Sequence, residues 1–495
     1  MKMNYLKYNQ LFLVVLLSLF VSCEDFLEKT PQGNLTQETF PVSASDALLA
    51  VNACYAQLRA GDFNSGLFPL TDIMSDDAYK GSNEGDQATT IGPYNTFTFT
   101  TTSDQLKNWW PALYKGVKTT NVVLEKVPAI SMDEGLKSRY LGEASFLRAL
   151  FYFDLVRAWG GVPLITGLNP PLELARASKA EIYNQIKTDL RFSIAHLTEK
   201  SELGTKDLGR ATTGAAKALL AKVFLFEGNF DSCEYYALQV IESTEYGLEP
   251  LFTDASSING EHGIESVFEV GAQGVEAATG NSFANVQGVR GNPNRGWGFN
   301  RPSLDLRALF ETGDPRLKGT IIDLGDVLDG ITIAGDGDTP DITEDSEGNV
   351  IEIECYNRKV WTPGTTVPPQ FGHNRRIIRY ADVLLMAAEA LNENDKPAQA
   401  LIYLNLVRER AREGNNSILP DVNTTDKNQL RDAILLERRM ELALEGHRFW
   451  DLVRTGKAAE VLGPLGFVTG KHELFPIPQN EIDLSQGALT QNPNW

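Results

Sequence analysis

The sequence predicts a mainly α-helical protein, in which a scaffold of tetratricopeptide-like helical hairpins accompanies a large irregular part with short β-strands. Apolar residues recur at helical spacing over long segments. Two of these segments repeat the same arrangement of small residues. Two further stretches, rich in Gly, Asn and Thr, lack the helical period and predict long loops.

The helical pattern runs in order through most of the chain. Gly160-Gly161 ends the third helix, Gly228-Asn229 divides one later segment into two helices, and residues 392–396 divide another. The segments predicted to be helical are 46–58, 106–127, 134–159, 179–197, 212–241, 376–411 and 426–454.

Two helical pairs share a tetratricopeptide-like spacing. Ala221 and Cys233 are 12 residues apart, and so are Ala388 and Ala400. Small residues at these positions allow two antiparallel helices to approach closely. The apolar companions are Leu220, Phe224, Ala237 and Val240 in one pair, and Ala387, Leu391, Leu404 and Val407 in the other. The sequence therefore predicts a stack of helical hairpins.

The two irregular stretches are residues 61–104 and 246–373. In the first, Phe97 and Phe99 alternate with threonines, which predicts a half-buried strand. In the second, SVFEV at 266–270 also predicts a strand. Loops of this length in a compact domain are usually functional, so we expect them to build a binding surface.

Composition limits the partners of the chain. Its formal net charge is −20, which excludes a nucleic-acid-binding role that depends on basic patches and is compatible with a neutral ligand. The phosphate-binding, zinc-protease and serine-hydrolase motifs GxGxxG, GxxxxGK[ST], HExxH and GxSxG are absent from the sequence. We therefore expect neither an enzyme nor a resident cofactor.

Two clusters of acidic residues each have two interpretations. Glu437, Glu441 and Glu445 share one helical face; with the nearby arginines they indicate a structural ion-pair network, and a catalytic carboxylate pair is the alternative.

The acidic segment 334–354 is predicted to be a solvated loop. The alternative is a weak calcium site at Asp336, Asp338 and Asp341, although the EF-hand pattern is not met.

The N-terminus predicts a lipoprotein. Residues 11–21 form an apolar run too short to span a membrane but typical of a signal peptide. The run stops at Ser22-Cys23, which predicts removal of residues 1–22 and lipidation of Cys23; a secreted protein with an incidental Cys23 is the alternative. Acyl chains on this cysteine would hold the protein on a membrane.

Three further cysteines remain in the chain, Cys54, Cys233 and Cys355. The first two are predicted to be small buried residues.

Several motifs together resemble the SusD/RagB family of Bacteroidetes outer-membrane lipoproteins. They are SCEDFLEKTPQG at 22–33, WWPALYKGVKTTN at 109–121, RYLGEASFLRALFYFDLVRAWGGVPLI at 139–165, RRIIRYADVLLMAAEALNE at 375–393, ERRMELALEGHRFWDLVRTG at 437–456 and the ending LFPIPQNEI…QNPNW. Phe20 before the lipidation site and Asn494-Trp495 at the end depart from the family pattern.

The resemblance implies a single domain at 23–495 with about four tetratricopeptide-like units. Its helical scaffold would cover about 39–60, 105–245 and 374–460, and its binding part 61–104 and 246–373. It also implies a surface-exposed lipoprotein with Glu24-Asp25 as an export signal. Such a protein captures a glycan without altering it, as the lid of a SusC-like TonB-dependent transporter. A peptide-binding, RagB-like lid is the alternative, and a surface glycoside hydrolase is a remote one.

Ligand contacts cannot be carried over from the family motifs, because those motifs belong to the scaffold. Sugars stack their apolar faces on aromatic rings, and their hydroxyls bind polar side chains. The predicted aromatic contacts are Trp297, Tyr79, Tyr94, Phe299 and Trp361, with Trp297 and Tyr79 favoured. The predicted polar contacts are Asp76, Asp77, Asn83, Asn292, Asn294 and Arg295. Local packing is the alternative role of each aromatic, whereas Trp109 and Trp110 are predicted to be core residues.

Overall fold

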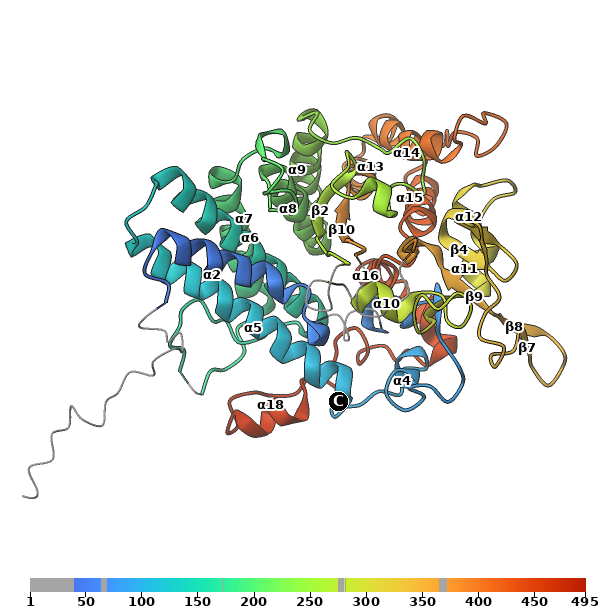
Figure 1. Cartoon of the computed structure of the whole chain (residues 1–495), viewed down its shortest axis with the longest axis horizontal. Helices are drawn as coiled ribbons and strands as arrows, with labels where there is room; N and C mark the ends of the chain where they lie inside the picture. The colour runs from blue at the N-terminus through green and yellow to red at the C-terminus, as the bar shows by residue number, and fades with distance from the viewer. Residues whose placement is uncertain (1–39, 64–68, 172, 275–279, 281, 365–371) are drawn as a thin grey trace, which may run out of the picture. The chain divides into compact units, whose positions relative to one another are not determined.

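Long helices packed side by side form the first part of the scaffold (Figure 1). They are α2 (Ala44–Gln57), α5 (Asp104–Lys126), α6 (Glu134–Trp159) and α7 (Lys179–His196). The computed structural model describes residues 40–63, 69–171, 173–274, 280, 282–364 and 372–495. Residues Ser43–Trp495 make up one compact unit. In the described part of the chain, no helix is long and apolar enough to cross a membrane.

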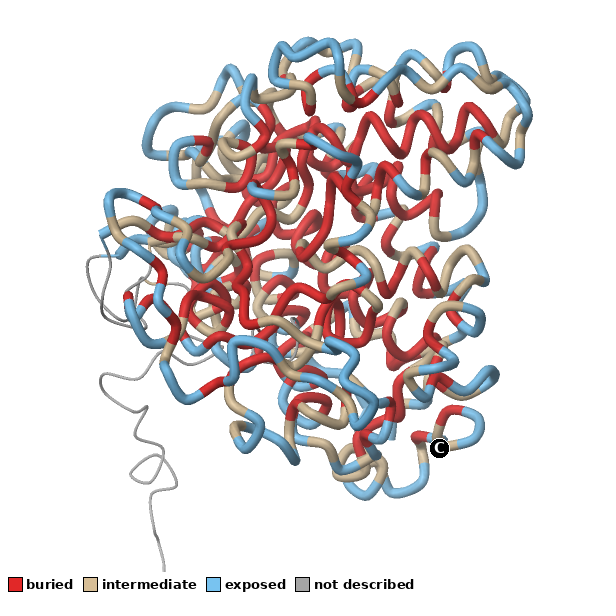
Figure 2. The backbone as a smooth tube through the Cα atoms, turned by 90° about the vertical axis from the view of Figure 1, so that its right-hand side faces the viewer, coloured by how far each residue is buried: buried red, intermediate tan, exposed pale blue. Residues whose placement is uncertain are grey.

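The two predicted hairpins are confirmed. They are α8 (Thr213–Glu227) with α9 (Phe230–Glu242), and α13 (Tyr380–Glu393) with α14 (Pro397–Ala411). The first hairpin packs on the second through α9 and α13, and α15 (Lys427–Glu441) covers α13 and α14. The small residues at the crossings, Ala221, Cys233, Ala388 and Ala400, are fully buried. Figure 2 shows buried backbone along the inner sides of the helices and exposed backbone at the outer turns.

Local sequence explains where these helices begin and end. Ser43 and Ser178 each form a capping box at a helix start, and the side chain of Asp133 accepts from the backbone N–H of Leu136. Gly228 ends α8 in the left-handed conformation, at φ +70°, which suits a residue without a side chain. Trp109 and Trp110 are buried in the core, as predicted.

Tertiary contacts change two of the predicted helical segments. Residues 376–379 belong to a strand, β10 (Arg375–Arg379), that pairs antiparallel with the wholly buried β2 (Ser266–Val270). Strand β2 is predicted correctly, and its buried backbone groups require this partner. The segment 426–454 divides into α15 and α16 (Arg448–Arg454). Between them Gly446 takes φ +83°, and its N–H donates to the Asp72 carboxylate at 2.9 Å.

The strand predicted around Phe97 and Phe99 is not formed. The helical turn α4 (Gly92–Asn95) precedes this segment, and Phe97 has φ +55°. Both rings are buried, and the Phe99 ring lies 6.0 Å from the ring of Phe475 and 5.1 Å from that of Trp495. The alternation of Phe97 and Phe99 with threonines therefore places both rings in an aromatic cluster that packs on the C-terminal segment.

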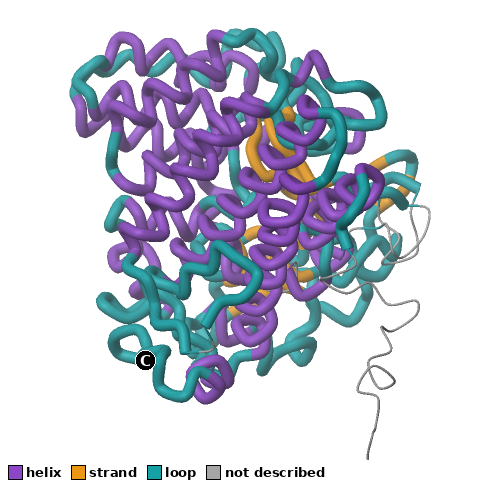
Figure 3. The backbone as a smooth tube through the Cα atoms, turned by 90° about the vertical axis from the view of Figure 1, so that its left-hand side faces the viewer, coloured by secondary structure: helices purple, strands orange, loops and turns teal. Residues whose placement is uncertain are grey.

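The loop-rich part carries short two-stranded antiparallel sheets, which Figure 3 shows as orange segments among loops. Strand β1 (Ala78–Gly81) pairs with β3 (Phe299–Pro302), and β4 (Ile321–Asp323) pairs with β9 (Cys355–Asn357). The remaining pairs are β5 (Val327–Leu328) with β6 (Ile331–Thr332), and β7 (Ile342–Glu344) with β8 (Val350–Ile353). Short helices complete this part and the C-terminus: α10 (Ser282–Gln287), α11 (Leu304–Leu309), α12 (Arg316–Thr320), α17 (Ala458–Leu462) and α18 (Gln479–Leu484).

The glutamate face of α15 is structural, as predicted. Glu437 and Glu441 are fully buried, and each pairs with arginines from other elements. Glu445, just beyond the helix, pairs with Arg379 at 2.8 Å and with Lys359 at 2.5 Å. This network ties α15 to α12, β10 and α14.

The three described cysteines are free thiols and buried: Cys54 on α2, Cys233 on α9 and Cys355 on β9. Burial raises the pKa of Cys54 to about 12 and that of Cys355 to about 11. The prediction that Cys54 and Cys233 serve as small core residues is therefore confirmed.

Candidate functional site

Trp297 lies on a rigid loop with its indole in solvent. Trp297 is 51% exposed. Its backbone N–H donates to the Asn285 carbonyl at 3.1 Å, and the next N–H, of Gly298, donates to the Gly288 carbonyl at 2.9 Å. A Cβ added at Gly296 would lie 2.2 Å from the Asn285 carbonyl oxygen, so only glycine allows this close approach. The loop thus presents a large apolar ring on a well-anchored backbone.

The turn after β1 lies directly beside this loop. The Ser82 N–H donates to the Gly298 carbonyl at 2.7 Å. The ammonium group of Lys80 donates to the backbone carbonyls of Gly81, Asn83 and Asp86 at 2.9, 2.7 and 2.8 Å. These bonds hold the backbone of residues 81–86 in one conformation next to Trp297.

Arg290 is the centre of a polar cluster at the same place. Its guanidinium donates to the Ser82 hydroxyl at 2.8 Å and forms ion pairs with Asp86 and Asp336. The hydrogen bond from Ser82, together with the charge of Arg290, lowers the pKa of Asp86. The side chains of Arg290 and Asp86 are 29% and 42% exposed, so both can reach a ligand.

Two predicted polar residues join this cluster. The side chain of Asn83 contacts the hydroxyl of Thr339. Asn292 is exposed, and its backbone N–H donates to the Gly335 carbonyl at 2.8 Å, which places it beside the acidic segment. Asn294, also exposed, lies three residues from Trp297. We call the set Trp297, Ser82, Asn83, Asp86, Arg290 and Asn292 the Trp297 site. It combines an apolar ring, on which a sugar face can stack, with hydrogen-bond donors and acceptors for the sugar hydroxyls.

Tyr79, Trp361 and Arg295 lie at less accessible positions. Tyr79 is half-buried in β1 opposite Arg301, and burial raises its pKa. Trp361 is half-buried too, and its indole N–H donates to the Asp329 carboxylate at 2.7 Å. The Arg295 guanidinium lies 5.7 Å from the centre of the Trp361 ring and Arg295 is only 4% exposed. The prediction of Arg295 as a ligand contact is therefore wrong.

Two other predicted aromatics are core residues. Tyr94 is fully buried, and its ring stacks on Phe99 at 5.0 Å. Phe299 is 5% exposed and lies beneath the ammonium group of Lys80. Neither ring offers a face to a ligand, so the alternative of local packing is correct for both.

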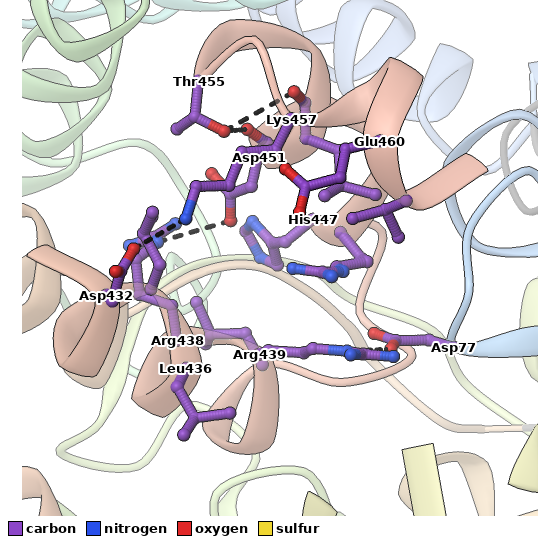
Figure 4. Close-up of a pocket in the computed structure, with 15 residues that line it drawn as sticks. Asp77, Asp432, Leu436, Arg438, Arg439, His447, Asp451, Thr455, Lys457 and Glu460 are labelled. Atoms are coloured by element: carbon purple, nitrogen blue, oxygen red, sulfur yellow. Dashed lines mark hydrogen bonds and ion pairs between the residues drawn. The ribbon is translucent and has the colours of Figure 1, made fainter. Parts of the chain in front are cut away.

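Asp76 and Asp77 are engaged in structural ion pairs, and Figure 4 shows Asp77 beside Arg439. Asp76 pairs with Arg448 and Arg439, both at 2.8 Å, and Asp77 pairs with Arg439 at 2.6 Å. They join the 69–77 segment to α15 and α16, and their predicted role as ligand contacts is wrong. The adjoining pocket has a volume of about 280 Å³. Further ion pairs line this pocket, such as Asp432 with Lys457 at 2.6 Å.

The calcium site, which was the alternative interpretation of the acidic segment, is not formed by its described residues. Asp336 accepts from the guanidinium of Arg290 and from the N–H groups of Asp338 and Thr339, which together outweigh burial and lower its pKa. Asp338 and Asp341 are exposed. Across the described ranges, no group of three or more His, Cys, Asp or Glu side chains could hold a metal ion. Cys23 and the signal peptide lie outside the described residues.

Sequence reasoning missed Arg290, Ser82 and Asp86. Arg290 and Asp86 are 204 positions apart, and nothing in the local sequence of either distinguishes it from a solvated surface residue. The acidic composition of 334–341 was the only sequence signal for a cationic partner nearby.

Comparisons with known proteins cover nearly the whole chain. A family model described as "SusD family" matches residues 264–467, and one described as "Starch-binding associating with outer membrane" matches residues 25–225. "SusD-like protein P2" of Formosa agariphila is 30% identical over 523 residues, which span 99% of this chain and all of the relative.

Solved structures show the same fold. A "Laminarin binding SusD-like protein" has a TM-score of 0.76 and 29% sequence identity, over 92% of this chain and 100% of that chain. "Surface glycan-binding protein A" of Bacteroides thetaiotaomicron, in complex with laminarihexaose, has a TM-score of 0.77 and 25% identity, over 91% of this chain and 100% of that chain. The scaffold of helical hairpins is therefore common to this chain and these proteins.

Proposed function

This chain belongs to the SusD/RagB family, and on that premise we propose that it captures an oligosaccharide at the cell surface for import. It binds the glycan without altering it, and acts as the lid of a SusC-like TonB-dependent transporter in nutrient uptake. Acyl chains on Cys23 anchor it to the outer membrane, with the folded chain facing outward.

The observation that carries this proposal is the exposed indole of Trp297 beside hydrogen-bonding groups held in place. An aromatic ring on a rigid loop binds a pyranose face with little loss of conformational freedom. Arg290, Asp86 and Asn83 supply donors and acceptors for sugar hydroxyls at its side. The named ligands of the two solved relatives, laminarin and laminarihexaose, support a neutral oligosaccharide of that kind.

The ion pairs of the carboxylates support glycan binding rather than glycan hydrolysis. Glycoside hydrolysis needs one carboxylic acid and one carboxylate facing each other across the scissile bond. The buried glutamates on and beyond α15 are paired with arginines, and Asp86 of the Trp297 site shares Arg290 with Asp336. Carboxylates held in this way stay ionised, so they make poor general acids.

Calorimetric titration of the soluble chain with laminarihexaose tests the proposal. We expect saturable binding that Trp297→Ala weakens by about 1–3 kcal/mol, the range of a stacking anchor residue, with an unchanged melting temperature. Tyr235→Ala is the matched control, because Tyr235 is an equally accessible aromatic, 58% exposed, on α9. Binding of peptides with no binding of oligosaccharides, or normal binding by Trp297→Ala, would contradict the proposal.

A further inference from the structure

A concave surface lies between α5, α18 and the segment 163–171. Its volume is about 460 Å³. Leu484 on α18 stands at its edge with 74% of its surface exposed. Figure 1 shows α18 beside the lower part of α5. The apolar residues lining this α5–α18 groove include Trp110, Tyr114, Pro163, Ile165, Leu484 and Leu489.

The walls of the groove are held by hydrogen bonds within the chain. The Tyr114 hydroxyl donates to the Pro163 carbonyl at 2.9 Å, which ties α5 to the 163–171 segment. The Gln479 N–H donates to the Thr101 carbonyl at 2.9 Å, which ties α18 to the residues before α5. Trp110 is 3% exposed and packs edge-on against Trp159 at 5.1 Å. The groove therefore exists before any partner arrives, and binding costs little reorganisation.

The rim of the groove is positively charged on a strongly acidic protein. Helix α5 contains four lysines and two acids, whereas the whole chain has a net charge of −20. Lys115 and Lys118 line the groove and are exposed, and neither has an ion-pair partner among the residues that the structure describes. The one lining carboxylate is that of Glu481, which accepts a hydrogen bond from the Asn480 amide at 2.8 Å. With two lysines against one carboxylate, the net charge of the rim is positive.

We propose that the α5–α18 groove is a docking site for an acidic segment of a partner protein that carries a leucine or phenylalanine anchor. The apolar floor takes the anchor residue, and Lys115 and Lys118 attract its acidic neighbours. A sugar would find few hydrogen-bonding groups on this floor. A membrane surface would require protruding apolar side chains, whereas most of the apolar lining here is recessed.

Fluorescence anisotropy of the soluble chain with synthetic peptides tests this docking site. The probe is a labelled peptide of about ten residues with a central Leu-Phe pair flanked by Asp and Glu. The comparison peptide has Lys in place of the acids. We expect saturable binding of the acidic peptide, weakened at least about tenfold by Leu484→Ser, which removes only an exposed side chain. The double variant Lys115→Glu/Lys118→Glu should lose the acidic peptide and bind the basic one.

Lys107→Glu is the matched control, since Lys107 is an exposed lysine on the same helix but does not line the groove. Laminarihexaose binding should be unchanged in every variant, which separates this test from that of the Trp297 site. The proposal is overturned by absence of saturable binding or by equal binding of both peptides. It is also overturned if Leu484 and the two lysines instead mediate self-association, or binding to phosphatidylglycerol vesicles.

Discussion

Nη1 of Arg379 lies 3.1 Å from Oε1 of Glu441, although the two residues are 62 positions apart. Arg379 ends β10 and Glu441 ends α15, and both side chains are shielded from solvent. Arg410 of α14 also binds the same carboxylate. This relationship joins the helical scaffold to the sheet that borders the loop-rich part.

Removing the charge of Glu441 should destabilise the fold without changing ligand binding. Glu441→Gln removes the charge of one of the two carboxylates that the buried Arg379 and Arg410 share, the other being Glu265. Breaking a buried pair costs about 3–5 kcal/mol. The free energy of unfolding from urea titration should fall by that amount. The control Glu409→Gln, at an exposed position on α14, should change it by less than about 0.5 kcal/mol. Normal stability of Glu441→Gln would show that the network is not structural.

Stability should fall steeply in acid. Burial by itself would raise the pKa of Glu441, but the charges of Arg410 and Arg379 outweigh it and lower the pKa from 4.5 to about 2. A depressed pKa contributes stability above the unfolded value, and this contribution is lost as the pH falls from about 4.5 to about 2. Urea titrations across this range should show a smaller pH slope for Glu441→Gln than for the native chain. Equal slopes would rule out Glu441 as a source of the acid sensitivity.

Gly116 should not tolerate alanine, despite the higher helix propensity of alanine. A Cβ at Gly116 on α5 would lie 2.5 Å from the ring of Phe151 on α6, which is fully buried. Replacing glycine by alanine in a helix stabilises it by about 1 kcal/mol. Displacing the Phe151 ring from its place in the core costs about 1–3 kcal/mol, and this cost outweighs the gain. Gly116→Ala should therefore lower the free energy of unfolding.

The double variant Gly116→Ala/Phe151→Leu tests the cause of that loss. If the clash with the ring is responsible, the double variant should be more stable than the sum of the two single changes predicts. Additive effects in this double-mutant cycle would contradict the proposed contact.

Arg290 should contribute to ligand binding more than to stability. Its ion pairs with Asp86 and Asp336 are partly exposed, so Arg290→Met should cost only about 0–1 kcal/mol of folding free energy. Loss of the guanidinium leaves the turn at residues 81–86 and the acidic segment without their common partner. We expect laminarihexaose affinity to fall about tenfold in calorimetric titration. Arg307→Met is matched in exposure, removes the surface pair with Asp323, and should bind normally.

Cys23→Ala should release the protein from the membrane. With acylation prevented, the structure offers no membrane-spanning helix among the described residues, and the net charge of −20 disfavours anionic lipid headgroups. Cell fractionation followed by immunoblotting should find the variant in the soluble fraction. Retention of the variant in membranes stripped of partner proteins would refute the anchor.

The sequence by itself determined the helical scaffold and the structural role of the glutamate face. The helix Glu134–Trp159 has the predicted bounds and ends at Gly160, because stop signals act over a few neighbouring residues. The small residues at Ala221, Cys233, Ala388 and Ala400 likewise indicated close helix packing. Glu437, Glu441 and Glu445 are spaced along one helical face among arginines. This spacing indicated a network in which arginines neutralise the three carboxylates.

Only the tertiary structure decided which polar and aromatic residues reach a ligand. Trp297, Tyr94 and Phe299 all lie in loop-rich sequence, yet the first is half exposed and the other two are core. Asp76 and Asp86 are close in sequence, but one is bound by Arg448 in the scaffold and the other by Arg290 at the surface. Local propensity carries no information about such partners, because a loop side chain is buried or paired by segments hundreds of residues away, and those contacts exist only after the chain has folded.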